Sequence, residues 1–312
     1  MSLVYNTQNG FTILRVPNIS KKCKYVHENG KIVSSEENKR IRRLGLPPAW
    51  TQVKVASNPW SHIQAFGYDQ KGRKQYRYHS EWSHKSSSKK FNKIVYLVKD
   101  IKTIRRHVYH DMKRGNILAL MAFIILVLHI RIGNEKYFRE NHSVGLCTLC
   151  KNHVHVMPHH KVRFCFTGKS GVDHCLVLKD PYAATLIHQL MKASGDKRLF
   201  KYNGRCVRSK DVNDYLASLS SHRYTAKDFR TYSANSIFVE KAKKALIPQN
   251  KTEAKRVLHS IVHEVASSLG HKDTMTKKSY VSPKLLNAYI ENPTQFRKYK
   301  MEQLLSKYLK NT

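Results

Sequence analysis

The pattern of apolar and polar residues divides the chain into a strand-rich first part and a longer second part. Before residue 86, runs such as FTILRV and QVKVA nearly alternate apolar and polar positions and are separated by Gly, Asn and Pro. This pattern predicts short β-strands, and ENKRIRRLG predicts a short basic helix among them. We therefore expect a β-rich N-terminal domain over residues 1–86. The polar, Ser-rich segment 84–90 is the predicted linker.

Helical spacing of apolar residues predominates in the second part, residues 87–312. The apolar run 117–130 predicts a buried helix, because it is too short to cross a bilayer. Residues 181–245 are also predicted to be helical. The expected fold class is α+β, with a small β-rich domain followed by a mainly α-helical domain that carries a small antiparallel sheet.

A hairpin is predicted between residues 162 and 177, where alternating apolar positions flank Gly168-Lys169-Ser170-Gly171. The two glycines are expected to supply the positive φ angles of a tight turn, which places Lys169 at its tip. The GKS triplet is also part of a nucleotide-binding loop. However, Arg163 stands where that loop needs its first glycine, and a hairpin is the wrong context for it. No nucleotide cofactor is expected.

Basic residues mark the ends of several predicted helices. Arg131 directly follows the buried apolar run, and Lys227 and Arg230 lie near the start of a later helix. The next helix ends at a glycine that is followed directly by His271. Tyr280 comes nine residues after that histidine, and a last helix is predicted in the tail.

Composition points to a polyanionic partner. Lys and Arg total 57 against 21 acidic residues, a net charge of +36, which is more than solubility requires. A hydrophobic content of 41% and seventeen tyrosines argue against a disordered basic tail. Six cysteines in a chain of this length do not form a disulfide framework, and no secretory signal is recognised. We expect an intracellular protein with free thiols.

A zinc site is one reading of the segment around Cys147 and Cys150, because a CxxC pair precedes several histidines. A compact zinc site would ordinarily contain a second tight pair of ligands. Here His153 and His155 alternate in a strand-like run instead. We therefore expect thiols in a β segment and no metal.

The strand KQYRYH in the first part interleaves cations with aromatic rings. Period-two alternation places Tyr76 and Tyr78 on one face and Arg77 on the other. Cations can contact phosphates while flat rings lie against sugars or base edges, so this strand suits a surface that binds DNA. Aromatic residues on a strand more often belong to a core, and the charge excess is what favours binding.

Several long motifs in this chain resemble those of the type IB DNA topoisomerases, in the compact form of poxviruses, bacteria and some giant DNA viruses. The resemblance runs from about Leu46 to Tyr280. It is carried by PPAW with KGRKQYRYH, by RIGNEKYFRENHSVGLCTL, by FTGKSGVDH, by DVNDYL with TAKDFRTY, and by GH followed nine residues later by Tyr. Of these, PPAW and DVNDYL are closer to the bacterial and giant-virus members.

The resemblance implies a catalytic role for six residues. Tyr280 would be the nucleophile that forms a 3′-phosphotyrosyl bond, Arg131 and Arg230 the transition-state cations, and His271 a third phosphate donor. Lys169 would be the general acid, assisted by Lys227. The implied DNA contacts in the first domain are Gln75, Tyr76 and Tyr78, with Arg73 and Lys74 beside them.

The resemblance also implies an activity. The enzyme would relax supercoiled duplex DNA by transient cleavage and religation of one strand, without ATP, metal or another cofactor. Two guanidiniums can stabilise the charge that develops on the phosphate oxygens. We expect a monomer that clamps duplex DNA, located in the cytoplasm, nucleoid, viral factory or virion according to its source.

Two other functions stay open from the sequence. A tyrosine recombinase has a similar fold, nucleophile and basic residues, but it usually carries a histidine where this chain has Lys227. A non-enzymatic DNA-architectural protein would explain the charge and would not need Tyr280. A nuclease is disfavoured, because the sequence lacks a carboxylate cluster that could hold a metal.

Overall fold

Two hydrophobic cores organise the part of the chain that the computed structural model describes, residues 2–6, 8–16, 24–193 and 197–310. The chain divides into two units between Lys89 and Lys90. The strand-rich first part and the mainly helical second part expected from the sequence are both present, and the fold class is α+β.

The first unit is built on a five-stranded antiparallel sheet, with strand order β2-β1-β3-β4-β5. Its elements are η1 (Gln8–Gly10), β1 (Ile13–Val16), β2 (Lys24–His27), α1 (Ser35–Arg43), β3 (Thr51–Val55), β4 (Ile63–Tyr68) and β5 (Lys74–Tyr78). Helix α1 is the basic helix predicted from ENKRIRRLG, and it begins with a capping box between Ser34 and Glu37. Strand β5 is an edge strand, so one side of it is open to a partner.

A three-stranded antiparallel sheet, in the order β6-β7-β8, and the helices around it form the first half of the second unit, and the first of these helices, α2, begins in the first unit. The elements are α2 (Ser80–Lys113), α3 (Ile117–Leu128), α4 (Glu135–Asn141), η2 (Leu146–Thr148), η3 (Lys151–His153), β6 (Val154–Met157), β7 (Lys161–Thr167), η4 (Lys169–Gly171), β8 (Asp173–Lys179) and α5 (Pro181–Lys192). Helix α3 confirms the buried helix predicted from the apolar run, since eight of its residues are buried.

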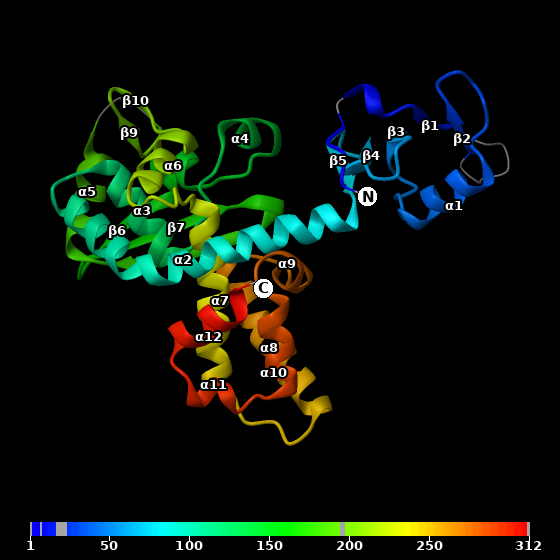
Figure 1. The fold of residues 1–312 in the computed structure, drawn as a ribbon. Coiled ribbons are helices and arrows are strands. Elements are labelled where there is room, and N and C mark those ends of the chain that lie inside the picture. The colour runs from blue at the N-terminus through cyan, green and yellow to red at the C-terminus, as the bar shows by residue number, and fades with distance from the viewer. Residues whose placement is uncertain (1, 7, 17–23, 194–196, 311–312) are drawn as a thin grey trace. The chain divides into compact units, whose positions relative to one another are not determined.

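Helices predominate in the rest of this unit. The elements are β9 (Lys201–Tyr202), β10 (Arg205–Cys206), α6 (Ser209–Ser218), α7 (Ala226–Lys244), α8 (Lys251–Leu269), α9 (Asp273–Ser279), α10 (Pro283–Glu291), α11 (Gln295–Lys298) and α12 (Met301–Leu309). Helix α7 packs against α3, α6, α8, α11 and α12, and in Figure 1 it runs from α3 and α6 down to the other three helices. It therefore links the parts of the unit that carry the candidate site.

Three local predictions were wrong. The expected linker 84–90 is part of the continuous helix α2, because the segment contains neither Gly nor Pro and its polar side chains remain helical on an exposed surface. The segment 181–245 is interrupted by the two-stranded sheet of β9 and β10. Cys147 lies in the 3-10 helix η2 rather than in a β segment, and it is buried.

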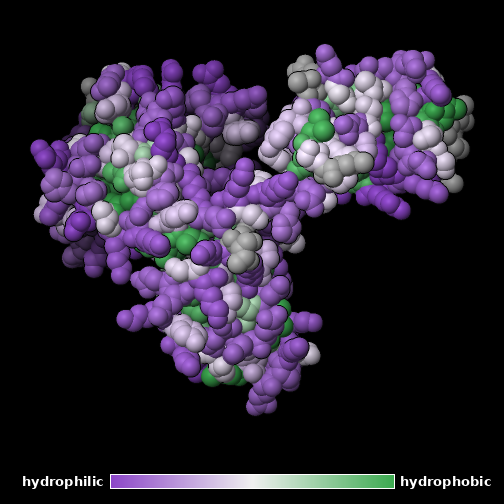
Figure 2. Space-filling view, in the orientation of Figure 1, coloured by the Kyte–Doolittle hydropathy of each residue, from purple (hydrophilic) through white to green (hydrophobic). Residues whose placement is uncertain are grey.

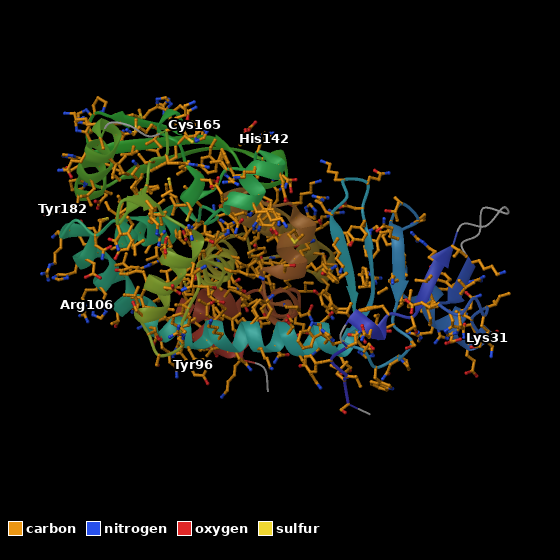
Figure 3. The ribbon with its side chains drawn as sticks, turned by 90° about the horizontal axis from the view of Figure 1, so that it is seen from above. Lys31, Tyr96, Arg106, His142, Cys165 and Tyr182 are labelled. Atoms are coloured by element: carbon orange, nitrogen blue, oxygen red, sulfur yellow. A yellow bond between two sulfur atoms is a disulfide. The ribbon has the colours of Figure 1, made fainter. Side chains whose placement is uncertain are left out.

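The expectation of free thiols was wrong for one pair. Cys165 and Cys175 stand opposite each other in the register of β7 and β8, with Cα atoms 4.2 Å apart, and are joined by a disulfide. Cys165 is labelled on this sheet in Figure 3. Counting cysteines could not reveal the pair, since it depends on cross-strand register. Cys147 and Cys150 are free, and Cys23 lies outside the described residues.

The hairpin that carries Lys169 was predicted correctly, but its turn differs in detail. Positive φ angles occur at Ser170 and Gly171, whereas Gly168 has a φ of −93°. A Cβ atom on Gly168 would lie 2.9 Å from the imidazole of His174. Gly168 is therefore required for space rather than for an unusual backbone conformation.

A contact between two glycine backbones fixes the segment that carries Arg131. The N–H groups of Leu146 and Cys147 donate to the carbonyls of Arg131 and Ile132, at 2.9 and 2.8 Å. Beside these bonds, a Cβ atom on Gly145 would lie 2.5 Å from the Cα atom of Gly133. The two segments can approach this closely only because both positions lack a side chain.

The surface agrees with the charge balance of the sequence. On the face seen in Figure 2, hydrophilic residues cover most of each unit and the hydrophobic patches are small and scattered. Figure 3 shows Tyr96 and Arg106 extending outward from α2. None of the helices in the described part of the chain is both long and apolar enough to cross a membrane.

The Gly133–Gly145 contact gives a direct test. Gly145 has a φ of −146°, which alanine tolerates, so Gly145→Ala should act through the steric clash alone. We expect the free energy of unfolding to fall by about 1–3 kcal/mol, as for other overpacked sites. We also expect the segment that carries Arg131 to move. Urea unfolding of the variant measures the loss. An unchanged midpoint would mean that the two backbones can separate without cost.

Candidate active site

Two guanidiniums meet at the C-terminal end of α8. Arg230 projects from α7, is 4% exposed, and donates from Nη2 to the carbonyl of Leu269 at 2.8 Å. Arg131 donates from Nη1 to the carbonyl of Gly270 at 3.3 Å. The last carbonyls of a helix lack partners within the helix and carry partial negative charge, so they attract cations. Gly270, with a φ of 60°, ends α8 as the sequence predicted.

The positive charge of this pair is not balanced by a carboxylate. Within the described residues, neither Arg131 nor Arg230 forms an ion pair with an acidic side chain. Burial, and then the nearby charge of Arg131, lower the pKa of Arg230 to about 10. Burial also lowers the pKa of Arg131. The Nε–H group of Arg230 is buried and has no hydrogen-bond partner within the described structure. The arrangement is therefore suited to receive an anion.

His271 lies directly against Arg230. Its Nε2 atom is 2.9 Å from Nη2 of Arg230, and a guanidinium can only donate, so Nε2 is the acceptor. Burial, followed by the charges of Arg230 and Arg131, lowers the pKa of His271 to about 3. The imidazole is therefore neutral and carries its proton on Nδ1, which is buried and has no partner within the described residues.

Tyr280 completes the group. Its ring centroid lies 4.1 Å from that of His271, and the electrostatic interaction with Tyr280 raises the pKa of Arg230 against the larger lowering effect of burial. The residues before Tyr280 form the short helix α9, and Tyr280 stands at its C-terminal end. Residues from three separate parts of the second unit thus converge on one tyrosine hydroxyl.

Asn235, which the sequence analysis did not single out, holds the backbone at Tyr280. Its Nδ2 group donates to the carbonyls of Thr231 and Tyr280, at 2.7 and 2.8 Å. Its Oδ1 atom accepts from the N–H group of Ser282 at 2.9 Å. The side chain is completely buried. Asn235 lies five positions after Arg230 on α7. A polar asparagine on an otherwise buried helix face is the signal by which the sequence could have revealed it.

Lys169 and Lys227 are near this group without touching it. Both side chains are exposed, and in the described structure neither ammonium group makes a hydrogen bond with the other four residues. The charge of Lys169 nevertheless contributes to the lowered pKa of His271. The charge of Lys227 acts on Lys90, whose pKa falls to about 8 mainly because of burial.

The five predicted DNA-contacting residues lie on or beside β5 of the first unit. Tyr76 and Tyr78 are exposed, and their ring centroids are 6.1 Å apart. The Lys74 ammonium lies 4.0 Å from the centroid of the Phe66 ring. Arg73 and Gln75 both bind Asp69, at 2.8 and 3.0 Å, and the pKa of Asp69 falls to about 2, chiefly through its hydrogen bond with Arg73. Apart from Gln75, the residues of β5 are exposed.

The structure offers no alternative centre based on a metal among the described residues, where no group of three or more His, Cys, Asp and Glu side chains could hold an ion. In the segment considered for zinc, burial raises the pKa of the Cys147 thiol to about 12. The Nδ1 atom of His153 accepts from the N–H group of Cys150 at 3.0 Å. These groups are therefore occupied in local packing.

Comparisons with known proteins cover most of the chain. A family model described as eukaryotic DNA topoisomerase I, catalytic core, matches residues 79–306, and one described as bacterial DNA topoisomerase IB, N-terminal domain, matches residues 22–69. DNA topoisomerase 1B of Acanthamoeba polyphaga mimivirus is 32% identical over 293 residues, which cover 88% of this chain and 87% of the relative. DNA topoisomerase 1B of Vaccinia virus (strain Copenhagen) is 24% identical over 258 residues, 79% of this chain and 80% of the relative.

We expect Asn235→Ala to destabilise the chain by about 1–3 kcal/mol, because it leaves buried backbone groups of Tyr280 and Ser282 without partners. The adjacent Ser236→Ala is the matched control, since the Ser236 hydroxyl is buried without a partner in the described structure. Urea unfolding compares the two variants. Equal losses would show that the bonds of Asn235 contribute nothing specific.

The lowered pKa of His271 makes stability depend on pH. Below its ordinary value of 6.5 the unfolded chain takes up a proton at this residue, whereas the folded chain does so only near 3. Unfolding therefore becomes easier as the pH falls through this window. In His271→Gln the fall in unfolding free energy between pH 7 and pH 5 should be smaller than in the native chain. Urea titrations at both pH values measure it, and an equal fall would contradict the buried neutral state.

Proposed function

This chain belongs to the type IB DNA topoisomerase family, and we propose that it relaxes supercoiled duplex DNA through a covalent intermediate at Tyr280. One strand is cleaved, the duplex rotates about the other strand, and the same bond is resealed. The proposed cycle uses neither ATP nor a metal, and its cations are side chains of the chain itself.

The observation that carries this proposal is the pair of Arg230, which is buried, and Arg131, which is partly buried, without a balancing carboxylate among the described residues. Burying a charge is costly unless it is paired. The protein bears this cost next to a tyrosine hydroxyl, with an unsatisfied Nε–H group on Arg230. A phosphodiester supplies the missing acceptors, because its nonbridging oxygens accept from forked guanidinium donors.

Binding of the phosphate changes the partners of His271. In the free chain Arg230 donates to Nε2 of His271. In the proposed complex, the phosphate oxygens take over this donor of Arg230. The imidazole is then free to donate a third hydrogen bond to the phosphate, once a proton is present on Nε2. The anion offsets the charges that keep His271 neutral.

The chemical step exchanges one ester for another. The Tyr280 oxygen attacks phosphorus and gives up its proton to water as the new bond forms, while the bond from phosphorus to the 5′-oxygen breaks. Lys169 gives a proton to the departing 5′-oxygen from the tip of the β7–β8 hairpin, and Lys227 assists it. Resealing is the reverse exchange. It needs no ATP, because the phosphotyrosyl ester conserves the energy of the bond.

Contacts outside the site would provide affinity. The exposed rings of Tyr76 and Tyr78, with Lys74, Arg73 and Gln75 along the same strand, are suited to contact sugars and phosphates. A net charge of +36 supports binding of a polyanion that is strongly weakened by salt. We expect one chain to act alone on a duplex.

A tyrosine recombinase is the nearest alternative. It would also form a covalent adduct, but it would join different DNA sites rather than relax a plasmid. The lysine three positions before Arg230, Lys227, favours the topoisomerase. An architectural protein would bind DNA equally well without Tyr280, and it has no use for two arginines, one buried and one partly buried, that no carboxylate balances among the described residues.

The deciding experiment is relaxation of supercoiled plasmid in EDTA without ATP. The native chain should relax the plasmid and become linked to a 3′ DNA end when it is denatured during the reaction. Tyr280→Phe should bind DNA with similar affinity, yet lose both relaxation and the adduct. Tyr299→Phe removes a hydroxyl from a half-exposed tyrosine outside the site, and it should retain both activities.

Each other outcome has a definite meaning. If the native chain binds DNA tightly but does not relax it, the remaining explanation is a non-enzymatic architectural protein. A covalent adduct without relaxation would point to the recombinase. Relaxation that persists in Tyr280→Phe would reject Tyr280 as the nucleophile.

A further inference from the structure

A lysine outside the predicted site holds the backbone next to Tyr280. Lys90 lies in α2, and its Nζ atom donates to the carbonyl of Ser279 at 2.8 Å. Ser279 is the last residue of α9, and Tyr280 follows it directly. The bond joins residues 189 positions apart in the sequence, so the packing of the second unit, rather than local sequence, brings them together.

Helix α9 needs such support. It has seven residues, and its N-cap position, Lys272, makes no side-chain capping bond. Helices of this length are not stable alone in water, and the carbonyls of the last turn have no partner within the helix. A lysine ammonium at this end satisfies one carbonyl and interacts favourably with the helix dipole.

The position of Lys90 is costly for a lysine. Burial, followed by the charge of Lys227, lowers its pKa to about 8, and its ammonium also lies 4.2 Å from the centroid of the Phe91 ring. Neighbouring lysines on α2, such as Lys99, are exposed and avoid this cost. In the described structure the Lys90 ammonium makes one hydrogen bond, to the carbonyl of Ser279, and this bond offsets the cost of its burial.

Together, Lys90 and Asn235 hold both peptide groups that flank the Tyr280 side chain. Lys90 binds the carbonyl of Ser279 from α2, and Asn235 binds the carbonyl of Tyr280 from α7, each at 2.8 Å. With both carbonyls fixed, the direction of the Cα–Cβ bond of Tyr280 is also fixed. The place of the hydroxyl beside Arg230 then depends on these two anchors.

We propose that Lys90 is a positioning residue for Tyr280: its ammonium fixes the end of α9 so that the hydroxyl is held in line for attack. This inference rests on the proposed role of Tyr280 as the nucleophile. Lys90 itself touches neither the phosphate nor the reacting atoms. Helix α2 begins at Ser80 in the first unit and continues into the second, so the anchor of the nucleophile belongs to the element that connects the two units.

The test compares Lys90→Ala with Lys90→Arg and with the control Lys99→Ala, which removes a charge from an exposed position of the same helix. Plasmid relaxation is measured at saturating protein, and affinity is measured separately on a labelled duplex. Lys90→Ala should relax the plasmid about tenfold more slowly, the effect of losing one hydrogen bond to a charged group, with affinity within about twofold of native. Lys90→Arg should recover most of the rate, because a guanidinium can also donate to the carbonyl, and Lys99→Ala should keep the native rate.

A second readout does not depend on activity. The N–H groups of Tyr280 and Val281 both donate to the carbonyl of Thr276, and they should exchange with solvent faster in free Lys90→Ala than in the native chain. Unchanged exchange at both amides would overturn the proposal even if relaxation were slower. Reduced affinity with an unchanged rate at saturation would also overturn it, since Lys90 would then be a DNA contact. If the native chain relaxes no DNA, the proposed function fails, and the exchange measurement still decides whether Lys90 anchors Tyr280.

Discussion

The second unit depends on one electrostatic constraint: a buried arginine, Arg230, lies beside a partly buried one, Arg131, and neither has an acidic partner among the described residues. Arg131 and Arg230 are held by the carbonyls of Gly270 and Leu269 instead of by carboxylates. A carbonyl satisfies a donor without cancelling its charge, so the site remains positive while its hydrogen bonds are largely made. A carboxylate in the same place would neutralise the pair and compete with a phosphate. The end of α8 thus makes a charged site compatible with a folded core.

This constraint explains why distant segments are fixed so firmly around the site. Arg131 is placed by a contact between the backbones of Gly133 and Gly145, and Arg230 lies on α7, which packs against five other helices. His271 is neutral because it is largely removed from water and, in addition, lies close to both guanidiniums. Like charges repel one another, so they stay close only where the surrounding structure leaves them no room to separate. The rigidity of the unit and the chemistry of the site have the same origin.

Much of this arrangement could be predicted from the sequence, and the remainder shows where sequence reasoning ends. The apolar run before Arg131, the glycine that ends α8 and the hairpin of Lys169 follow local rules that a single sequence displays. The anchors Lys90 and Asn235 do not, because their partners lie 189 and 45 positions away. The disulfide between Cys165 and Cys175 depends on cross-strand register. The helical state of 84–90 depends on the absence of a helix breaker rather than on a positive signal.

The two carbonyls beside Tyr280 also matter for mechanics. In the proposed cycle a rotating duplex is attached to the protein through a single side chain, so any torque on the cut strand reaches the backbone at one residue. A backbone held by a hydrogen bond on only one side of Tyr280 would move under this torque, and the phosphotyrosyl group would lose its alignment for resealing. Hydrogen bonds from Lys90 on α2 and from Asn235 on α7 hold the backbone on both sides of Tyr280, so it resists this displacement. The fidelity of resealing would then depend on the strength of these two hydrogen bonds as well as on the chemistry of the phosphate.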